Sequence, residues 1–210
     1  KAGTYFVNSI NSKSDIEASL VSILTDLIGL RSDYPPGDTV EICKYTEQRL
    51  KKLGYRIKNH THVSPINNLV VELGDGSPSV VFNVHVDTVG PGLLSSWSGN
   101  PYRAEIKDKR VYGLGAANCK GSMALHIWLA EEISRCGGIR SGTISFTFVG
   151  DEESLGPNGT KSLRDRSIIR PDILIVGAPS SNDLLIDERG VMWLRLATRG
   201  TGGHAGDPAS

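Results

Sequence analysis

The sequence predicts an α/β fold built on a mixed, mostly parallel sheet. Two observations indicate this class. Apolar runs rich in β-branched residues alternate along the chain with segments whose apolar residues recur at helical spacing, which is typical of strands connected through helices. The composition also agrees with a folded chain, since 39% of the 210 residues are hydrophobic and 22% are charged.

Helices are expected in three places. Residues 15–30 carry an apolar stripe at helical spacing, and Ser14 with Glu17 is expected to form a capping box at the start of this helix. A second amphipathic helix is expected over about residues 39–53, between a Pro-Pro-Gly break and a glycine. The third helix is expected over about residues 121–136.

Strands account for most of the remaining regular structure. The first strongly apolar strand is expected over residues 79–86, where β-branched residues are frequent. We expect strands over residues 55–58, 68–73, 79–86, 143–149, 172–176, 184–186 and 191–198, and a small hairpin over residues 102–112.

Charge, hydropathy and cysteine content exclude several classes of protein. The 23 basic residues balance the 23 acidic ones, so nothing attracts the chain as a whole to nucleic acid or to an anionic membrane. No apolar run approaches the roughly 18–20 residues of a membrane span, and residues 1–14 lack the apolar core of a signal peptide. The three cysteines are odd in number and form no spaced pair, which favours a reducing, cytoplasmic location.

Polar side chains follow two of the expected apolar strands. His85 and Asp87 lie at the end of one strand, and Asp151, Glu152 and Glu153 come directly after another. The two-residue period of a strand places His85 and Asp87 on one face. Ligands of open α/β sheets bind beyond the carboxyl ends of the strands, so we expect these groups to lie at one edge of the sheet.

Together these groups indicate a hydrolytic metal site. Alone, His85 would be a satisfied strand-end histidine and the acidic run a surface turn. Three adjacent carboxylates repel one another unless solvent or a cation neutralises them. Adjacent glutamates can also divide the work, because one binds the metal while the other takes the proton of the attacking water.

Other motifs give weaker predictions. Residues 115–122 differ from a phosphate-binding loop, because Lys-Gly-Ser stands where Gly-Lys-Ser or Gly-Lys-Thr is needed. A partial dinucleotide fingerprint over residues 200–205 is not followed by a helix or a ribose-binding acid within the sequence. His60, His62 and His126 have no ligand-like neighbours, so we expect them to be structural or exposed.

Seven short stretches resemble a known family. The chain resembles the zinc metallopeptidase and aminoacylase family of acetylornithine deacetylase, succinyl-diaminopimelate desuccinylase and glutamate-releasing carboxypeptidases. The matching stretches include Val-His-Val-Asp, Gly-Leu-Gly-Ala-Ala-Asn-Cys-Lys-Gly and Gly-Asp-Glu-Glu. They lie at residues 84–87, 97–102, 111–121, 150–153, 176–179, 188–190 and 203–205.

This resemblance implies an architecture and an activity. Residues 1–187 would belong to a zinc-peptidase-like, three-layer α/β/α catalytic domain, and residues 188–210 would begin an inserted α+β lid and dimerisation domain. The family binds two zinc ions, with cobalt as a possible substitute. It hydrolyses an amide bond of an N-acyl amino acid or small peptide, so the protein would be a homodimeric deacylase or carboxypeptidase of amino-acid metabolism.

The resemblance also assigns roles to individual residues. His85 would ligate one metal and Glu153 the other. Asp87 would stabilise His85 without binding the metal itself, and Glu152 would be the general base. His204 would correspond to the histidine of the inserted domain that reaches the partner's active site.

Two positions depart from the family pattern. Asn118 stands where the family has an aspartate that bridges both metals, and Ala178 stands where it has an acidic ligand. The rest of the inserted domain, and a last histidine ligand from the C-terminal return, would lie beyond residue 210. A degenerate relative that binds a ligand or partner without hydrolysing it is therefore the alternative expectation.

Overall fold

The computed structural model describes residues 12–181, 183–187, 190, 192, 194 and 196–200. The chain divides into two units, residues 1–179 and 180–210, and the helices and strands given below all lie in the first.

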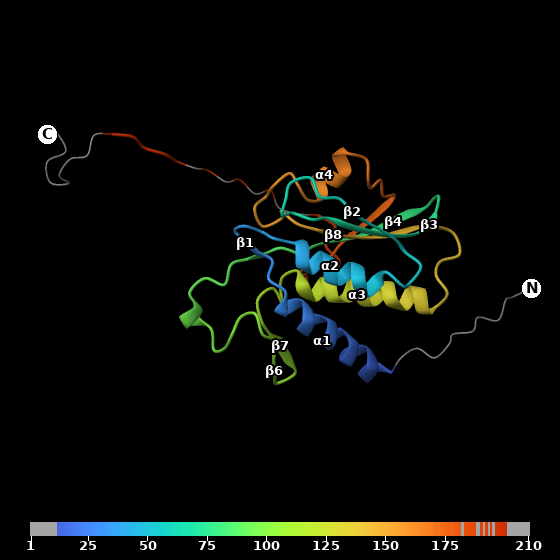
Figure 1. Cartoon of the computed structure of the whole chain (residues 1–210), viewed down its shortest axis with the longest axis horizontal. Coiled ribbons are helices and arrows are strands. Elements are labelled where there is room, and N and C mark those ends of the chain that lie inside the picture. Colours follow the sequence, from blue (N-terminus) through green and yellow to red (C-terminus); the bar gives the residue numbers. More distant parts are fainter. Residues whose placement is uncertain are drawn as a thin grey trace, which may run out of the picture. The chain divides into compact units, whose positions relative to one another are not determined.

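A five-stranded mixed sheet forms the centre of the first unit (Figure 1). Its strand order is β2-β3-β8-β4-β9, and β8, β4 and β9 run parallel while β2 and β3 pair antiparallel with their neighbours. The expected mixed sheet is thus confirmed. The strands are β2 (Arg56–Asn59), β3 (Leu69–Asp75), β4 (Ser79–His85), β8 (Gly142–Val149) and β9 (Ile173–Val176).

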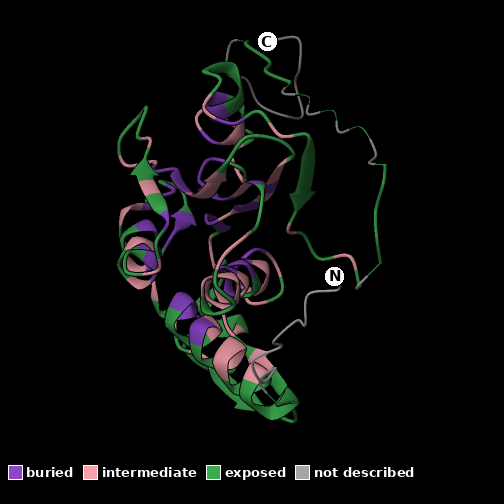
Figure 2. Ribbon diagram, turned by 90° about the vertical axis from the view of Figure 1, so that its right-hand side faces the viewer, coloured by how far each residue is buried: buried purple, intermediate pink, exposed green. Residues whose placement is uncertain are grey.

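Helices cover both faces of this sheet, which gives three layers. Helices α1 (Lys13–Gly29), α2 (Val40–Leu50) and α3 (Lys120–Arg135) lie on one side, and α4 (Thr160–Asp165) lies on the other (Figure 1). Successive side chains of a strand point to opposite faces of the sheet, so each strand can pack against the helices on both sides. Buried residues concentrate between these layers (Figure 2).

Two apolar clusters hold the layers together. Phe146 and Phe148 of β8 belong to the main core, which they share with buried residues of α1, α2 and α3. The next residue along the strand, Val149, belongs to a smaller cluster on the opposite face, where it packs with Leu163 of α4. Residues of even number in β8 therefore face the three long helices, and those of odd number face α4.

The first helix begins two residues earlier than expected, and its cap differs accordingly. Ser12, rather than Ser14, is the N-cap, and its hydroxyl accepts a hydrogen bond from the backbone N–H of Asp15. The Asp15 carboxylate accepts in return from the backbone N–H of Ser12, so the capping box joins these two residues. The box needs a partner three residues after the cap, and Asp15 takes that place once the helix starts at Lys13.

Several short elements complete the unit. The expected hairpin is present as β6 (Glu105–Lys107) and β7 (Arg110–Tyr112). The sequence did not predict β1 (Asp33–Tyr34), which pairs with β5 (Thr88–Val89), or the short helix η1 (Leu94–Ser96). Among the described residues, none of the helices combines the length and the apolar character needed to cross a bilayer.

The strands expected after residue 180 are not borne out where the structure describes them. Leu184, Leu185 and Ile186 form no strand and are strongly exposed. A strand needs a hydrogen-bonded partner, and no described segment pairs with them. Of the strand expected over residues 191–198, residues 191, 193 and 195 lie outside the described part, and the others form no strand.

Candidate metal centre

The candidate site lies where the parallel strands end. His85 is the last residue of β4 and is paired in register with Val149, the last residue of β8. The Gly-Asp-Glu-Glu turn follows immediately after Val149, so its carboxylates come back toward His85. On the other side of β4, Asn83 is paired with Val176, the last residue of β9, and Ala178 follows two residues later.

His85 is held by its neighbour two residues on. Its Nδ1 atom lies 2.9 Å from the backbone oxygen of Asp87 and 3.6 Å from Asp87 Oδ1. With a proton on Nδ1 donated to that carbonyl, Nε2 keeps its lone pair for a ligand. Burial favours the neutral imidazole, but the hydrogen bond to Asp87 and the charges of Glu152, Asp87 and Glu153 outweigh it and raise the pKa of His85.

Asp87 lies beneath the site with only 1% of its surface exposed. Its Oδ2 atom accepts a hydrogen bond from the backbone N–H of Glu153, at 3.0 Å. Its Oδ1 atom is buried without a hydrogen-bond partner. An unpaired buried carboxylate oxygen is costly unless a positive charge lies close by. Asp87 thus connects His85 with the acidic turn.

Asp151 has a structural task that the sequence did not reveal. Its φ angle of 66° is left-handed, which aspartate tolerates better than most residues. Its carboxylate accepts hydrogen bonds from the hydroxyl of Ser154 and from the backbone and side-chain nitrogens of Asn158, the latter two at 2.9 and 2.8 Å. Asp151 therefore closes the loop, and Glu152 and Glu153 are the acids left for chemistry.

One His/carboxylate group in the described part of the chain has the spacing of a metal site. His85, Glu152 and Glu153 each offer a ligand atom, and these atoms lie within 4.8 Å of one another. Imidazole and carboxylate are ligands that zinc accepts. The Glu152 side chain is 55% exposed, and it lines a pocket of about 250 Å³ together with Leu155 and Lys161.

The two positions that depart from the family pattern differ in what they contact. Asn118 joins the cluster, because its Nδ2 atom donates a hydrogen bond of 2.6 Å to Glu153 Oε1. Ala178 is exposed after β9 and has no ligand atom in its side chain. The structure therefore brings His85, Asn118 and Glu153 together with Asp87 and Glu152, while His204 lies outside the described residues.

Lys120 supports the loop that carries Asn118, a role that the sequence analysis did not predict. It is fully buried at the start of α3, and its Nζ atom donates to the backbone oxygen of Leu30 at 2.8 Å. Burial lowers the pKa of Lys120 to about 8. The backbone N–H groups of Asn118 and Lys120 both bond to the carbonyl of Gly115. A lysine inside a glycine-rich, otherwise uncharged segment was the signal available.

The remaining histidines lie outside this group. His126 is buried on α3, where its ring packs edge-on against Phe82 with centroids 5.6 Å apart. Burial lowers the pKa of His126 to about 4. His62 is exposed and His60 is half-buried. The expectation that these three are structural or exposed is confirmed.

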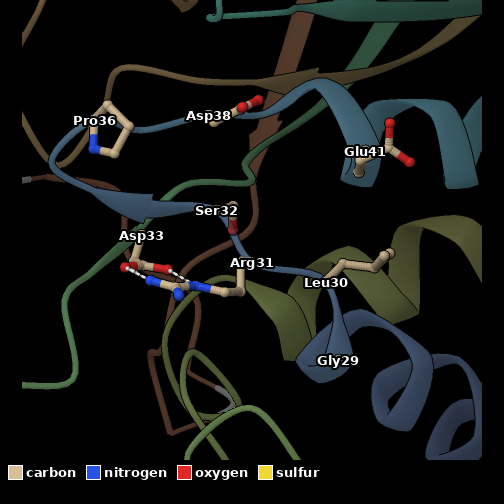
Figure 3. Close-up of a pocket in the computed structure, with 8 residues that line it drawn as sticks. All are labelled: Gly29, Leu30, Arg31, Ser32, Asp33, Pro36, Asp38 and Glu41. Carbon is tan, nitrogen blue, oxygen red and sulfur yellow. Dashed lines mark hydrogen bonds and ion pairs between the residues drawn. The ribbon is translucent and has the colours of Figure 1, made fainter.

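Another pocket, of about 470 Å³, is lined by residues from the end of α1 to the first turn of α2 (Figure 3). On its wall Arg31 and Asp33 form an ion pair with an Nη2–Oδ2 distance of 2.9 Å, and the bond from Arg31 lowers the pKa of Asp33. The guanidinium also lies 4.5 Å from the centre of the Tyr102 ring. This pocket contains none of the residues expected at the metal site.

Comparison with known families gives a consistent match. The family described as peptidase family M20/M25/M40 matches residues 81–189, about half of the chain. A succinyl-diaminopimelate desuccinylase of Parvibaculum lavamentivorans is 37% identical over 174 residues, which cover 77% of this chain and 44% of that protein. The enzyme of the same name from Bordetella petrii is 32% identical over 200 residues, covering 91% and 52%. The chain spans about half the length of these curated relatives.

Solved structures show the same fold at lower identity. Human carnosine dipeptidase 1 superposes with a TM-score of 0.67 at 21% identity, covering 79% of this chain and 39% of that one. An M20 metallo-carboxypeptidase of Sulfolobus solfataricus gives 0.63 at 18% identity, covering 75% and 36%. A dinuclear metal-binding M20 peptidase of Bacillus subtilis gives 0.54 at 15%, covering 79% and 43%.

Proposed function

Because the chain belongs to the peptidase family M20/M25/M40, we propose that it carries the metal-binding part of a hydrolase that cleaves an amide bond. The observation that carries this proposal is the grouping of His85, Glu152 and Glu153 within 4.8 Å at the carboxyl ends of parallel strands. The substrate class is an N-acyl amino acid or a small peptide. This follows the names of the matched relatives, which are desuccinylases, a dipeptidase and a carboxypeptidase.

The residues present fit a divalent cation, and zinc with cobalt as a substitute is the proposed choice. His85 and Glu153 would hold it, and Asp87 would fix the ring orientation of His85. The buried, unpartnered Oδ1 atom of Asp87 supports this assignment, because it calls for positive charge near the imidazole. When bound, such an ion supplies a Lewis acid and lowers the pKa of water.

Glu152 is the proposed general base. Its carboxylate is the more exposed of the two glutamates, which leaves it open to water, and it also lines the 250 Å³ pocket beside Leu155 and Lys161. Its Oε2 atom lies 3.7 Å from His85 Nδ1, which keeps it next to the metal ligands. A base in this position takes a proton from water and returns it to the leaving amine.

The larger organisation is also a proposal. Residue 188 would begin the inserted domain, and His204 would reach the active site of a partner subunit in a homodimer, as the Gly-His-Ala motif of the family implies. A reducing compartment, the cytoplasm, is proposed because Cys43, Cys119 and Cys136 are free thiols. The alternative of a binder without hydrolysis is less favoured, since the matched relatives are enzymes.

The test measures amino-acid release from a panel of N-acetyl and N-succinyl amino acids and dipeptides. It uses the complete protein that contains these residues, loaded with zinc or cobalt. Turnover that a chelator removes and added metal restores is the expected result. Metal-loaded, folded protein that is inactive on the whole panel would contradict the proposal. Asn100→Asp, a substitution at an exposed residue whose side chain accepts a hydrogen bond from the Tyr102 backbone N–H, is the activity control.

A further inference from the structure

The cluster does not fit a centre with two metal ions. The matched Bacillus subtilis peptidase is dinuclear, and two adjacent cations repel each other, so a carboxylate shared between them stabilises the pair. The position that resembles the bridging acid is Asn118, whose amide is neutral. Ala178 offers no ligand atom at the end of β9. In the part of the chain that the structure describes, the single candidate group of ligands is His85, Glu152 and Glu153.

The contact between Asn118 and Glu153 gives the asparagine a structural role. The two side chains approach to 2.6 Å, between Asn118 Nδ2 and Glu153 Oε1. An amide N–H next to an anionic oxygen is a charge-assisted hydrogen bond. An aspartate at the same place would set two carboxylates against each other, and such a pair needs a proton or a cation between them. The amide removes that requirement.

The contacts of Glu153 and Asp87 are those expected around a single cation. Glu153 is fixed twice, by Asn118 at its carboxylate and by Asp87 at its backbone N–H. Its carboxylate still offers a ligand atom within 4.8 Å of those of His85 and Glu152. Independently, Asp87 Oδ1 is buried without a hydrogen-bond partner, 3.6 Å from the ring of His85. A cation bound through the imidazole would compensate that buried negative charge.

We propose that the hydrogen bond from the Asn118 amide to Glu153 replaces the contact that a second metal ion would make, so that the centre binds one divalent cation per chain. The ion is held by His85 and Glu153, and Glu152 lies within reach of it. This inference deepens the proposed function, because the ion is the one that hydrolysis would use. It changes the expected stoichiometry from that of the dinuclear relative.

The first experiment counts bound metal. The complete protein is stripped with a chelator, dialysed and titrated with zinc or cobalt by calorimetry, and the loaded protein is weighed by native mass spectrometry. One equivalent per chain supports the proposal. Two equivalents, or none, would overturn it. Hydrolysis measured on the same samples separates the two proposals: two ions with turnover would refute only the stoichiometry, and one ion without turnover would refute only the proposed function.

The second experiment tests the amide itself by thermal unfolding in chelator. Asn118→Asp should melt lower than the natural protein, by roughly 5 °C, and added zinc should restore the loss. In a Glu153→Gln background the same substitution should cost little, because the opposing carboxylate is gone. Asn100→Asp is the matched control, since its Oδ1 atom only accepts a bond from the Tyr102 N–H and an aspartate keeps that role. An Asn118→Asp loss that is equal with and without Glu153 would show that the contact is incidental.

Discussion

Replacing His126 by leucine should remove a large part of the acid sensitivity of the fold. His126 is 4% exposed on α3, and its ring contacts Phe82 and lies near Phe146. Its Nδ1 atom is buried without a hydrogen-bond partner. Burial lowers the pKa of His126 from 6.5 to about 4. The native state therefore holds this imidazole neutral at pH values where the unfolded chain protonates it.

The sign and size follow from proton linkage. Between pH 6.5 and about 4 the unfolded state binds more protons at His126, so stability falls as the pH falls through this window. A folded pKa of about 4 gives a loss of about 2 kcal/mol between pH 7 and pH 5. At pH 7 the substitution should be close to neutral, because the leucine fills a similar volume and removes an unsatisfied nitrogen.

The assay is urea unfolding of the complete protein in chelator at pH 7 and pH 5, followed by tryptophan fluorescence. The natural protein should lose about 2 kcal/mol more than His126→Leu on acidification. Acid-labile groups elsewhere cancel in this comparison, because both proteins carry them. His62→Leu is the control for deleting an exposed histidine. Equal pH dependence in the natural protein and in His126→Leu would refute the reasoning.

Three further predictions concern the metal site and the loop that Asp151 closes beside it. Glu152→Gln should lower turnover by about 10²–10⁴-fold, while the metal content measured by elemental analysis stays nearly unchanged. Glu153→Gln should lower the metal content. The reverse pattern would exchange the roles of the two glutamates. Asn118→Asp combined with Ala178→Glu should raise zinc affinity and the calorimetric stoichiometry from one to two, and identical titrations would mean that the site is misplaced. Asp151→Ala should destabilise the protein by about 2–4 kcal/mol in urea unfolding, because three hydrogen bonds to a carboxylate are lost; a change below about 0.5 kcal/mol would remove its structural role.

The sequence predicted those elements whose signal is local. Strands β4 and β8 are runs of β-branched and aromatic residues, and their observed bounds lie within one residue of expectation. The charge cluster over residues 164–166 indicated the end of a helix, which α4 confirms, but its start could not be predicted, because six residues with Leu163 as their buried apolar side chain show no helical periodicity. The run over residues 184–186 is apolar enough for a strand, but pairing depends on a distant partner that local composition does not reveal.

Part of the site could also be predicted, because some of its residues are marked by local sequence patterns. His85 and the acidic turn were found because each follows an apolar strand, and parallel strands bring their carboxyl ends together. The division of labour in the turn could not be predicted. Asp151, Glu152 and Glu153 carry the same functional group, and the left-handed backbone that separates Asp151 from the others is a property of the folded loop. The bond from Asn118 joins residues 35 positions apart.

The closed loop at Asp151 has a consequence for reading related sequences. Few side chains combine tolerance of a left-handed backbone with an acceptor for the Asn158 amide, so drift at this position is limited by folding alone. A protein that has lost hydrolytic activity would still need this aspartate to fold, whereas its two glutamate neighbours could be substituted. Retention of the first acid of the triplet is thus uninformative about activity, and a comparison meant to separate working enzymes from inactive descendants should score Glu152 and Glu153 instead.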